Sequence, residues 1–154
     1  MEFDLVLIQG AKKALTECMG VKVGEVCLIV TDEKLFSLAM HFAQASRELQ
    51  VETLVISMTP RAIHGEEPPA PIAGALLAAN CAFLITSVSM SHTKARAAAT
   101  EAGVRIASMP GLTADMVRGP LNADYDDIVH LPKESLRCSP KLPRRFYSRK
   151  RALT

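Results

Sequence analysis

Two short segments of the sequence carry side chains that could do chemistry. The first contains Arg61, His64, Glu66 and Glu67, all within seven residues. An imidazole and two carboxylates at this spacing could bind a divalent metal ion and leave one carboxylate as a base. Adjacent loop residues rarely form a pre-organised three-ligand site without support from elsewhere in the fold. We therefore favour a role in structure or surface recognition, in which both glutamates stabilise the positive N-terminus of a helix that begins at Pro69.

The second segment follows a strongly apolar run and is rich in hydroxyl and basic side chains. Its members are Ser89, Ser91, His92, Thr93, Lys94 and Arg96. Hydroxyls and cations at the start of a helix suit a small anion such as a carboxylate or a phosphate. In the structural alternative, Ser91 or Thr93 only caps the helix and His92 lies in solvent. We favour this alternative, because anion sites at helix starts are common but unspecific.

No other motif in the sequence supports an enzyme class. Ser91 and His92 are neighbours in the chain, and nothing places a carboxylate behind the imidazole, so we assign no catalytic residue. The eight glycines nowhere spell G-x-G-x-x-G or G-x-x-x-x-G-K, so neither a dinucleotide-binding turn nor a P-loop is supported. His41, which we place on the polar face of a helix, and His130 have no partner that the sequence identifies.

Composition narrows the class of protein. The chain has 154 residues, of which 49% are hydrophobic and 22% charged, which is typical of one globular domain. The four cysteines form no C-x-x-C pair, and Cys27 and Cys81 lie in apolar runs, so we interpret these two as core residues in a reducing compartment. No apolar stretch approaches the roughly 18 residues of a membrane helix, and the N-terminus lacks the basic region of a signal peptide. We predict a cytoplasmic protein with no membrane partner.

Charge is divided unevenly along the chain. Residues 1–131 carry ten Lys or Arg and fifteen Asp or Glu, whereas residues 132–154 carry eight Lys or Arg and one Glu. The second segment has no apolar periodicity and contains two Pro turns, so we predict a disordered basic tail after a domain over 1–131. Its cations, with Phe146 and Tyr147, could hold nucleic acid in a salt-sensitive way. Basic charge alone carries no specificity, so we do not favour a nucleic-acid partner.

The elements that must position the two segments follow from periodicity. Continuous apolar runs predict buried strands over 26–30, 53–57 and 81–86, with a weaker strand over 104–108. Helical patterns separate them over 4–18, 33–49, 69–79 and 93–102, where Asp32 is placed to cap the second helix and Gly103 to end the fourth. Alternating strands and helices predict an α/β fold. We expect an open, mostly parallel four-stranded sheet of the Rossmann or flavodoxin type, with strand order 2-1-3-4 and helices on both faces.

Several motifs occur in order along this predicted domain. They are Gly20–Glu25 leading into Leu28–Asp32, His64–Pro69, Ser91–Thr93 with Ala95–Arg96, Met109–Gly111, and Ala123–Tyr125. From about Leu15 to Ile128 the chain resembles the amino-terminal domain of the M29-type (thermophilic) metallo-aminopeptidases. Leucyl-aminopeptidase-like proteins and dihydroxypyridine ring-cleaving dioxygenases share that architecture.

The resemblance implies a role within a larger enzyme. Members of the family add a carboxyl-terminal domain whose His, Glu and Asp side chains hold two divalent ions, which activate water to release an N-terminal amino acid. The sequence after Ile128 does not look like that continuation, and none of the family's metal positions can be carried over. We therefore expect no cofactor in this chain, and interpret the change near residue 131 as the mark of a truncated or frame-shifted product, or of a deliberate fragment.

Three functions remain open on these grounds. In the first, the chain is a non-catalytic amino-terminal domain that contacts the missing carboxyl-terminal domain, forms a homo-oligomer and lines one wall of the substrate cleft. Its contact residues would be Arg61, His64, Glu66, Glu67, Ser91, His92, Thr93 and Arg96. In the second, the chain is a stand-alone module that binds a small anion at the loop after the third strand. The third, nucleic-acid binding by the tail, is the least favoured.

Overall fold

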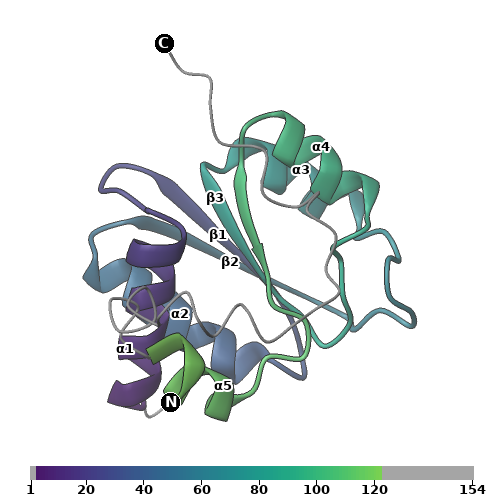
Figure 1. The fold of residues 1–154 in the computed structure, drawn as a ribbon. Helices are drawn as coiled ribbons and strands as arrows, with labels where there is room; N and C mark the ends of the chain where they lie inside the picture. The colour runs from purple at the N-terminus through teal and green to yellow at the C-terminus, as the bar shows by residue number, and fades with distance from the viewer. Residues whose placement is uncertain (1–2, 123–154) are drawn as a thin grey trace, which may run out of the picture. The chain divides into compact units, whose positions relative to one another are not determined.

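The computed structural model describes residues 3–122, which form an α/β unit around one parallel sheet (Figure 1). Its strands are β1 (Val26–Asp32), β2 (Glu52–Met58), β3 (Cys81–Ile85) and β4 (Arg105–Ser108). They are ordered β2-β1-β3-β4, and every neighbouring pair is parallel. The predicted fold class and strand order are therefore confirmed. The predicted boundary at residue 131 and the tail over 132–154 lie outside the described residues.

The two central strands form the core because both of their faces are covered. All five residues of β3 are buried, as are six of the seven in β1. The first six residues of the edge strand β2 are exposed or half-buried, and Leu54 is 48% exposed. Continuous apolar runs are typical of strands that helices cover on both sides. This is why the sequence predicts the strands over 26–30 and 81–86 correctly.

One face of the sheet carries α1 (Leu5–Lys13), α2 (Phe36–Glu48) and the short α5 (Ala114–Arg118) (Figure 1). A π-helical turn over Ala14–Cys18 extends α1, and a 3₁₀ turn over Pro120–Asn122 follows α5. Phe42 of α2 packs against Phe83 of β3, with ring centroids 5.6 Å apart. Asp4 caps α1 by accepting a hydrogen bond from Val6 N.

The other face carries α3 (Ala70–Ala78) and α4 (Lys94–Glu101) (Figure 1). Ile72 and Leu76 of α3 pack in one apolar cluster with Leu28, Val30 and Leu84 of the central strands. Gly103 ends α4 with a φ of +92°, and its N–H donates to Thr100 O, as the sequence predicts for a helix-ending glycine. Among the described residues, no helix is both long and apolar enough to cross a bilayer.

Three details differ from the sequence-based expectations. The second helix begins at Phe36, so Asp32 is the last residue of β1, and its carboxylate binds amides of the turn before the helix. His41 is buried rather than on a polar face, because α1 covers it: its Nε2 accepts from Asp4 N at 3.2 Å and its Nδ1 bonds Ser37 O at 2.9 Å. The helix α5 was not predicted, although Thr113 supplies an N-cap whose hydroxyl accepts from Met116 N.

Candidate functional site

The loops that follow the four strands meet at the carboxyl edge of the sheet. Ligands of open α/β sheets bind at this edge, at the point where the strand order reverses. In the order β2-β1-β3-β4 that point lies between the ends of β1 and β3. The side chains there decide what the fold can bind.

Asp32 occupies the reversal point. Its Oδ2 accepts hydrogen bonds from Ser87 N at 2.6 Å and from Ser87 Oγ at 2.7 Å, and its Oδ1 accepts from Lys34 N and Leu35 N at 3.1 and 3.3 Å. The side chain is 1% exposed. Four donors satisfy this buried carboxylate and tie the end of β1 to the loop after β3. Asp32 Oδ1 thus binds amides of the turn that leads into α2, as a capping residue would, but no feature of the sequence indicates its second partner, Ser87.

Glu67 binds at the start of α4, where the sequence suggests a site for a small anion. Its two carboxylate oxygens accept from Lys94 N at 2.5 Å and from Ala95 N at 3.2 Å, the first backbone amides of α4. A carboxylate is stable there because the unpaired N–H groups of a helix N-terminus attract negative charge. The expectation that Glu67 would stabilise the helix at Pro69 is therefore corrected, since it serves the following helix instead.

His64 joins the same two loops by a second set of bonds. Its Nδ1 accepts from Ser89 N at 3.0 Å, and the neighbouring Gly65 N donates to Ser89 O at 2.8 Å. Because Nδ1 is an acceptor, the neutral ring carries its proton on Nε2, and the His64 side chain is exposed. The neutral His64 imidazole can therefore donate one hydrogen bond from Nε2, and hydrogen bonds hold its loop in place.

Arg61 and Glu66 form an ion pair within the loop after β2. Arg61 Nη1 lies 3.6 Å from Glu66 Oε1, while Glu66 Oε2 accepts from Ala62 N at 2.9 Å. Arg61 Nε is buried and has no hydrogen-bond partner within residues 3–122. A buried donor without an acceptor costs roughly 1–3 kcal/mol, so this loop carries an unsatisfied polar group.

The hydroxyl segment after β3 mainly organises the start of α4. Thr93 is its N-cap: its Oγ1 accepts from Arg96 N at 3.2 Å and bonds Met90 O at 2.8 Å, which confirms the capping alternative. Ser91 Oγ bonds Ser89 Oγ at 3.0 Å and Ser108 Oγ of β4 at 2.8 Å. His92 is exposed, as that alternative requires.

The side chains of these loops are not arranged to bind the divalent metal ion that was considered for His64, Glu66 and Glu67. Glu66 and Glu67 each direct a carboxylate to backbone amides, and His64 Nδ1 is already an acceptor. Within residues 3–122 no group of three or more His, Cys, Asp or Glu side chains is arranged to hold a metal ion. The residues of this edge therefore serve as hydrogen-bonding groups.

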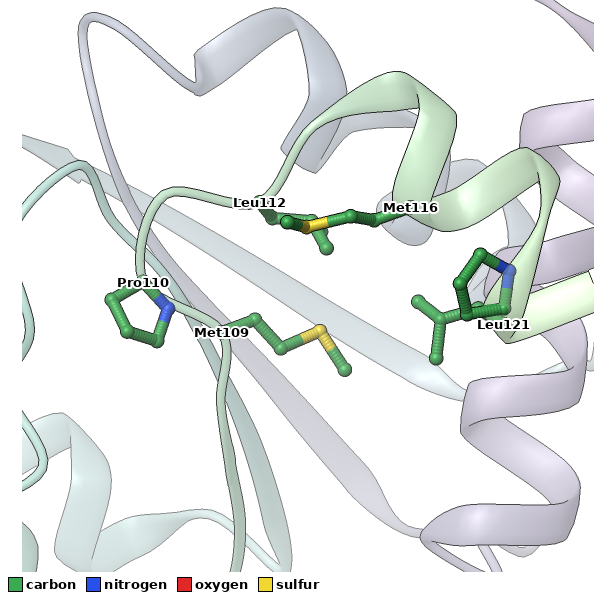
Figure 2. A pocket seen from close by; sticks show the side chains of 6 residues that line it. Met109, Pro110, Leu112, Met116 and Leu121 are labelled. Carbon is green, nitrogen blue, oxygen red and sulfur yellow. The ribbon is translucent and has the colours of Figure 1, made fainter.

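An apolar hollow of about 290 Å³ lies beyond the carboxyl end of β4 (Figure 2). Figure 2 shows Met109 and Leu121 extending toward one another across it. The full lining is Met109, Pro110, Leu112, Met116, Pro120 and Leu121. None of the contact residues predicted from the sequence lines this hollow, and its lining suits an apolar group.

Comparisons with known proteins bear on the fold. No protein-family model and no curated protein matches the chain. Among solved structures, the chain is similar to the 2,5-dihydroxypyridine dioxygenase of Pseudomonas putida KT2440, with a TM-score of 0.56 and 9% sequence identity. The likeness covers 71% of this chain and 36% of the dioxygenase, so the chain spans little more than a third of that protein's length. At this identity the likeness shows a shared α/β fold.

Proposed function

We propose that this chain is a non-catalytic amino-terminal domain of a metal-dependent, aminopeptidase-like enzyme. Its role would be to contact a carboxyl-terminal domain that holds two divalent ions, to form an oligomer, and to line one wall of the substrate cleft. The proposal places the protein in the cytoplasm, where Cys27 and Cys81 would be kept as thiols. It draws on the family resemblance of the sequence, and one structural observation supports it.

That observation is a set of four hydrogen bonds between the loop after β2 and the segment after β3. Ser89 N donates to His64, Gly65 N donates to Ser89 O, and the first two amides of α4 donate to Glu67. His64 accepts one of these bonds and His92 follows in the loop after β3, and both side chains are exposed. A contact surface needs such pre-organisation, because binding then costs less conformational entropy.

The alternative, a stand-alone module that binds a small anion, has weaker support. The amides of Lys94 and Ala95, which an anion would need, already bind the carboxylate of Glu67. An external phosphate or carboxylate would have to displace it. The observation therefore favours the contact-surface proposal over the anion module.

The test uses a separately expressed carboxyl-terminal domain of an M29-type aminopeptidase, loaded with its two divalent ions. Titration calorimetry should give saturable binding to this chain, and the chain alone should not hydrolyse an aminoacyl chromogenic substrate. Replacing both exposed imidazoles (His64→Ala, His92→Ala) should weaken binding about tenfold, in line with the loss of an interface anchor.

A matched control lies at the opposite edge of the sheet. Glu52 begins β2 and is exposed, so Glu52→Ala should leave the affinity unchanged. Absence of binding at protein concentrations on the order of 100 μM would contradict the proposal. Hydrolysis of the substrate by this chain alone, with stoichiometric metal, would contradict it independently.

A further inference from the structure

Four side chains form one row across the sheet near its amino edge. The strand register pairs Cys27 with Thr53 on β2 and with Cys81 on β3, and it pairs Cys81 with Arg105 on β4. Directly paired residues of parallel strands point to the same face. Both cysteines lie in the apolar cluster on the α1 and α2 face, and both are 0% exposed. The sequence places these thiols 54 positions apart, and the fold makes them neighbours.

The two thiols are close neighbours. The strand register places them directly opposite one another, and each shifts the pKa of the other, while the Cys81 thiol donates to Val26 O at 3.9 Å. Neighbouring strands lie about 4.8 Å apart, which is within the Cα separation of roughly 4.4–6.8 Å that a disulfide spans. A bond between the two sulphurs is thus compatible with the existing strand pairing.

Arg105 makes the two thiols chemically different. Its Nη1 and Nη2 bind both carboxylate oxygens of Glu25, at 3.0 and 2.5 Å. Its Nε is buried and has no hydrogen-bond partner among the described residues, and the strand register places Arg105 directly beside Cys81. A Cys81 thiolate would provide an acceptor for this Nε.

The same contacts divide the roles of the two cysteines. The interaction with Cys27 is the largest cause that lowers the pKa of Cys81, and the charge of Arg105 lowers it further. The pKa of Cys27 is raised, first by its interaction with Cys81 and then by burial. Cys81, which the register places beside Arg105, is therefore the more acidic thiol of the pair.

We propose that Cys27 and Cys81 form an oxidation site at which a hydroperoxide produces an intramolecular disulfide, with Arg105 directing the first step to Cys81. The Cys81 thiolate attacks the peroxide oxygen and becomes a sulfenic acid, and the peroxide's other oxygen leaves as water after taking up a proton. Cys27 sulphur then attacks Cys81 sulphur, and the sulfenic hydroxyl leaves as a second water. Two thiols lose two electrons and two protons in total, and one hydrogen peroxide becomes two waters.

The route to the site passes the Arg105 side chain. Cys81 is the first residue of β3, and the side chain of Arg105, its register partner on β4, is 38% exposed. Both cysteines are 0% exposed, so a local opening of the fold beside Arg105 must admit hydrogen peroxide before it can react.

The experiment uses the full chain with Cys18→Ser and Cys138→Ser, so that only the proposed pair remains. The protein is exposed to hydrogen peroxide, denatured, alkylated with iodoacetamide and examined by intact mass and peptide mapping. We expect a product lighter by two hydrogen atoms, no alkylation, and a Cys27–Cys81 cross-linked peptide. With Cys27→Ser added, dimedone should label Cys81. Free cysteine added to the same tube serves as a control for the oxidant. If the free cysteine is oxidised while Cys27 and Cys81 are both fully alkylated, the proposed oxidation site does not exist.

A second comparison tests the role of Arg105. Arg105→Gln should slow disulfide formation about tenfold at neutral pH, the effect of one pKa unit on the thiolate population. Arg105→Lys, which keeps the positive charge, should recover much of the rate, and Arg47→Gln on the exposed surface of α2 should leave it unchanged. Equal rates in Arg105→Gln and in the parent would refute the directing role of Arg105.

Discussion

Asp32 and Ser87 are joined by two short hydrogen bonds across the point where the strand order reverses. Asp32 Oδ2 accepts from both Ser87 N and Ser87 Oγ, at 2.6 and 2.7 Å. In many open α/β proteins this position receives the ligand. Here a buried carboxylate of the chain fills it, so the reversal point acts as a structural joint between β1 and β3.

Replacing Asp32 should therefore weaken the fold substantially. Asp32→Asn keeps the shape but turns one oxygen into an NH₂ group, which cannot accept from the Ser87 donors. Hydrogen bonds to a charged group contribute about 1.5–3 kcal/mol each, so we expect a loss of about 3 kcal/mol in the free energy of unfolding. Urea denaturation followed by circular dichroism measures this directly.

Two further variants calibrate that result. Ser87→Ala removes only the hydroxyl donor to the carboxylate and should cost about 1.5 kcal/mol. Glu33→Gln changes the adjacent exposed carboxylate and should stay within about 0.5 kcal/mol of the parent. If Asp32→Asn were no more harmful than Glu33→Gln, the joint would have no energetic role.

Glu67 leads to a prediction about ligand binding. Glu67→Ala should free the Lys94 and Ala95 amides and leave a helix N-terminus open to an anion. Loss of the carboxylate should lower stability by about 1 kcal/mol in dilute buffer. Added inorganic phosphate should then raise the melting temperature of Glu67→Ala more than that of the parent.

The control for this comparison is sodium chloride at matched ionic strength, which separates a specific anion from general salt effects. Exposed Glu101→Ala at the other end of α4 serves as the matched variant, and phosphate should affect it as it affects the parent. An equal phosphate response in all three proteins would show that the backbone amides at the start of α4 do not form an anion site.

The fold was accessible from the sequence because its signals are local. The runs at 26–30 and 81–86 are continuous, apolar and bounded by polar residues, which specifies buried strands. The short lengths of chain between elements, together with right-handed crossovers, left few strand orders. By contrast, α5 is only five residues long and too short to show helical periodicity. Its N-cap, Thr113, was the one local feature of the sequence that indicated a helix.

The candidate site was less accessible because its contacts are not local. Glu67 and Lys94 lie on the loops after β2 and β3, and in the sheet order β1 stands between those strands. Whether Glu67 serves the helix after it or the more distant α4 depends on how the loop crosses the end of β1. Charge and spacing alone favour the nearer helix, which is the interpretation that the structure corrects.

Stability should depend on pH through Glu25. The hydrogen bonds from Arg105 lower the pKa of this carboxyl below its ordinary value of 4.5, and the Lys22 amide lowers it further. A lowered pKa in the folded state means that the carboxylate contributes stability above the ordinary pKa, and that this contribution is lost as the pH falls through the folded value. Unfolding free energy should therefore decline more steeply below about pH 4.5 in the parent than in Glu25→Gln.

An exposed glutamate checks that this effect is local. Glu17 lies in the turn after α1, and Glu17→Gln should reproduce the parent's decline with acid. Urea titrations at several values between pH 3 and pH 7 would give the comparison. Parallel curves for Glu25→Gln and the parent would mean that the ion pair with Arg105 adds no stability.

Two glycines in helices should respond oppositely to the same substitution. A Cβ at Gly10 of α1 would lie 2.4 Å from Val117 O and 2.9 Å from Val117 Cγ1, so the two helices α1 and α5 approach too closely for any larger residue. Gly74 of α3 is exposed, and a Cβ there would meet nothing within 4 Å. Gly10→Ala should cost about 1–3 kcal/mol, because α5 must move away from α1.

Gly74→Ala should instead stabilise the protein by about 0.5–1 kcal/mol, since alanine loses less backbone entropy on entering a helix. Because the chemical change is identical, the difference between the two variants isolates the packing of α1 against α5. Thermal and urea unfolding of both proteins measure it. Should Gly10→Ala be as stable as Gly74→Ala, the close approach of α1 and α5 would not exist in solution, and the apolar hollow beside Met116 would lose the support of α5.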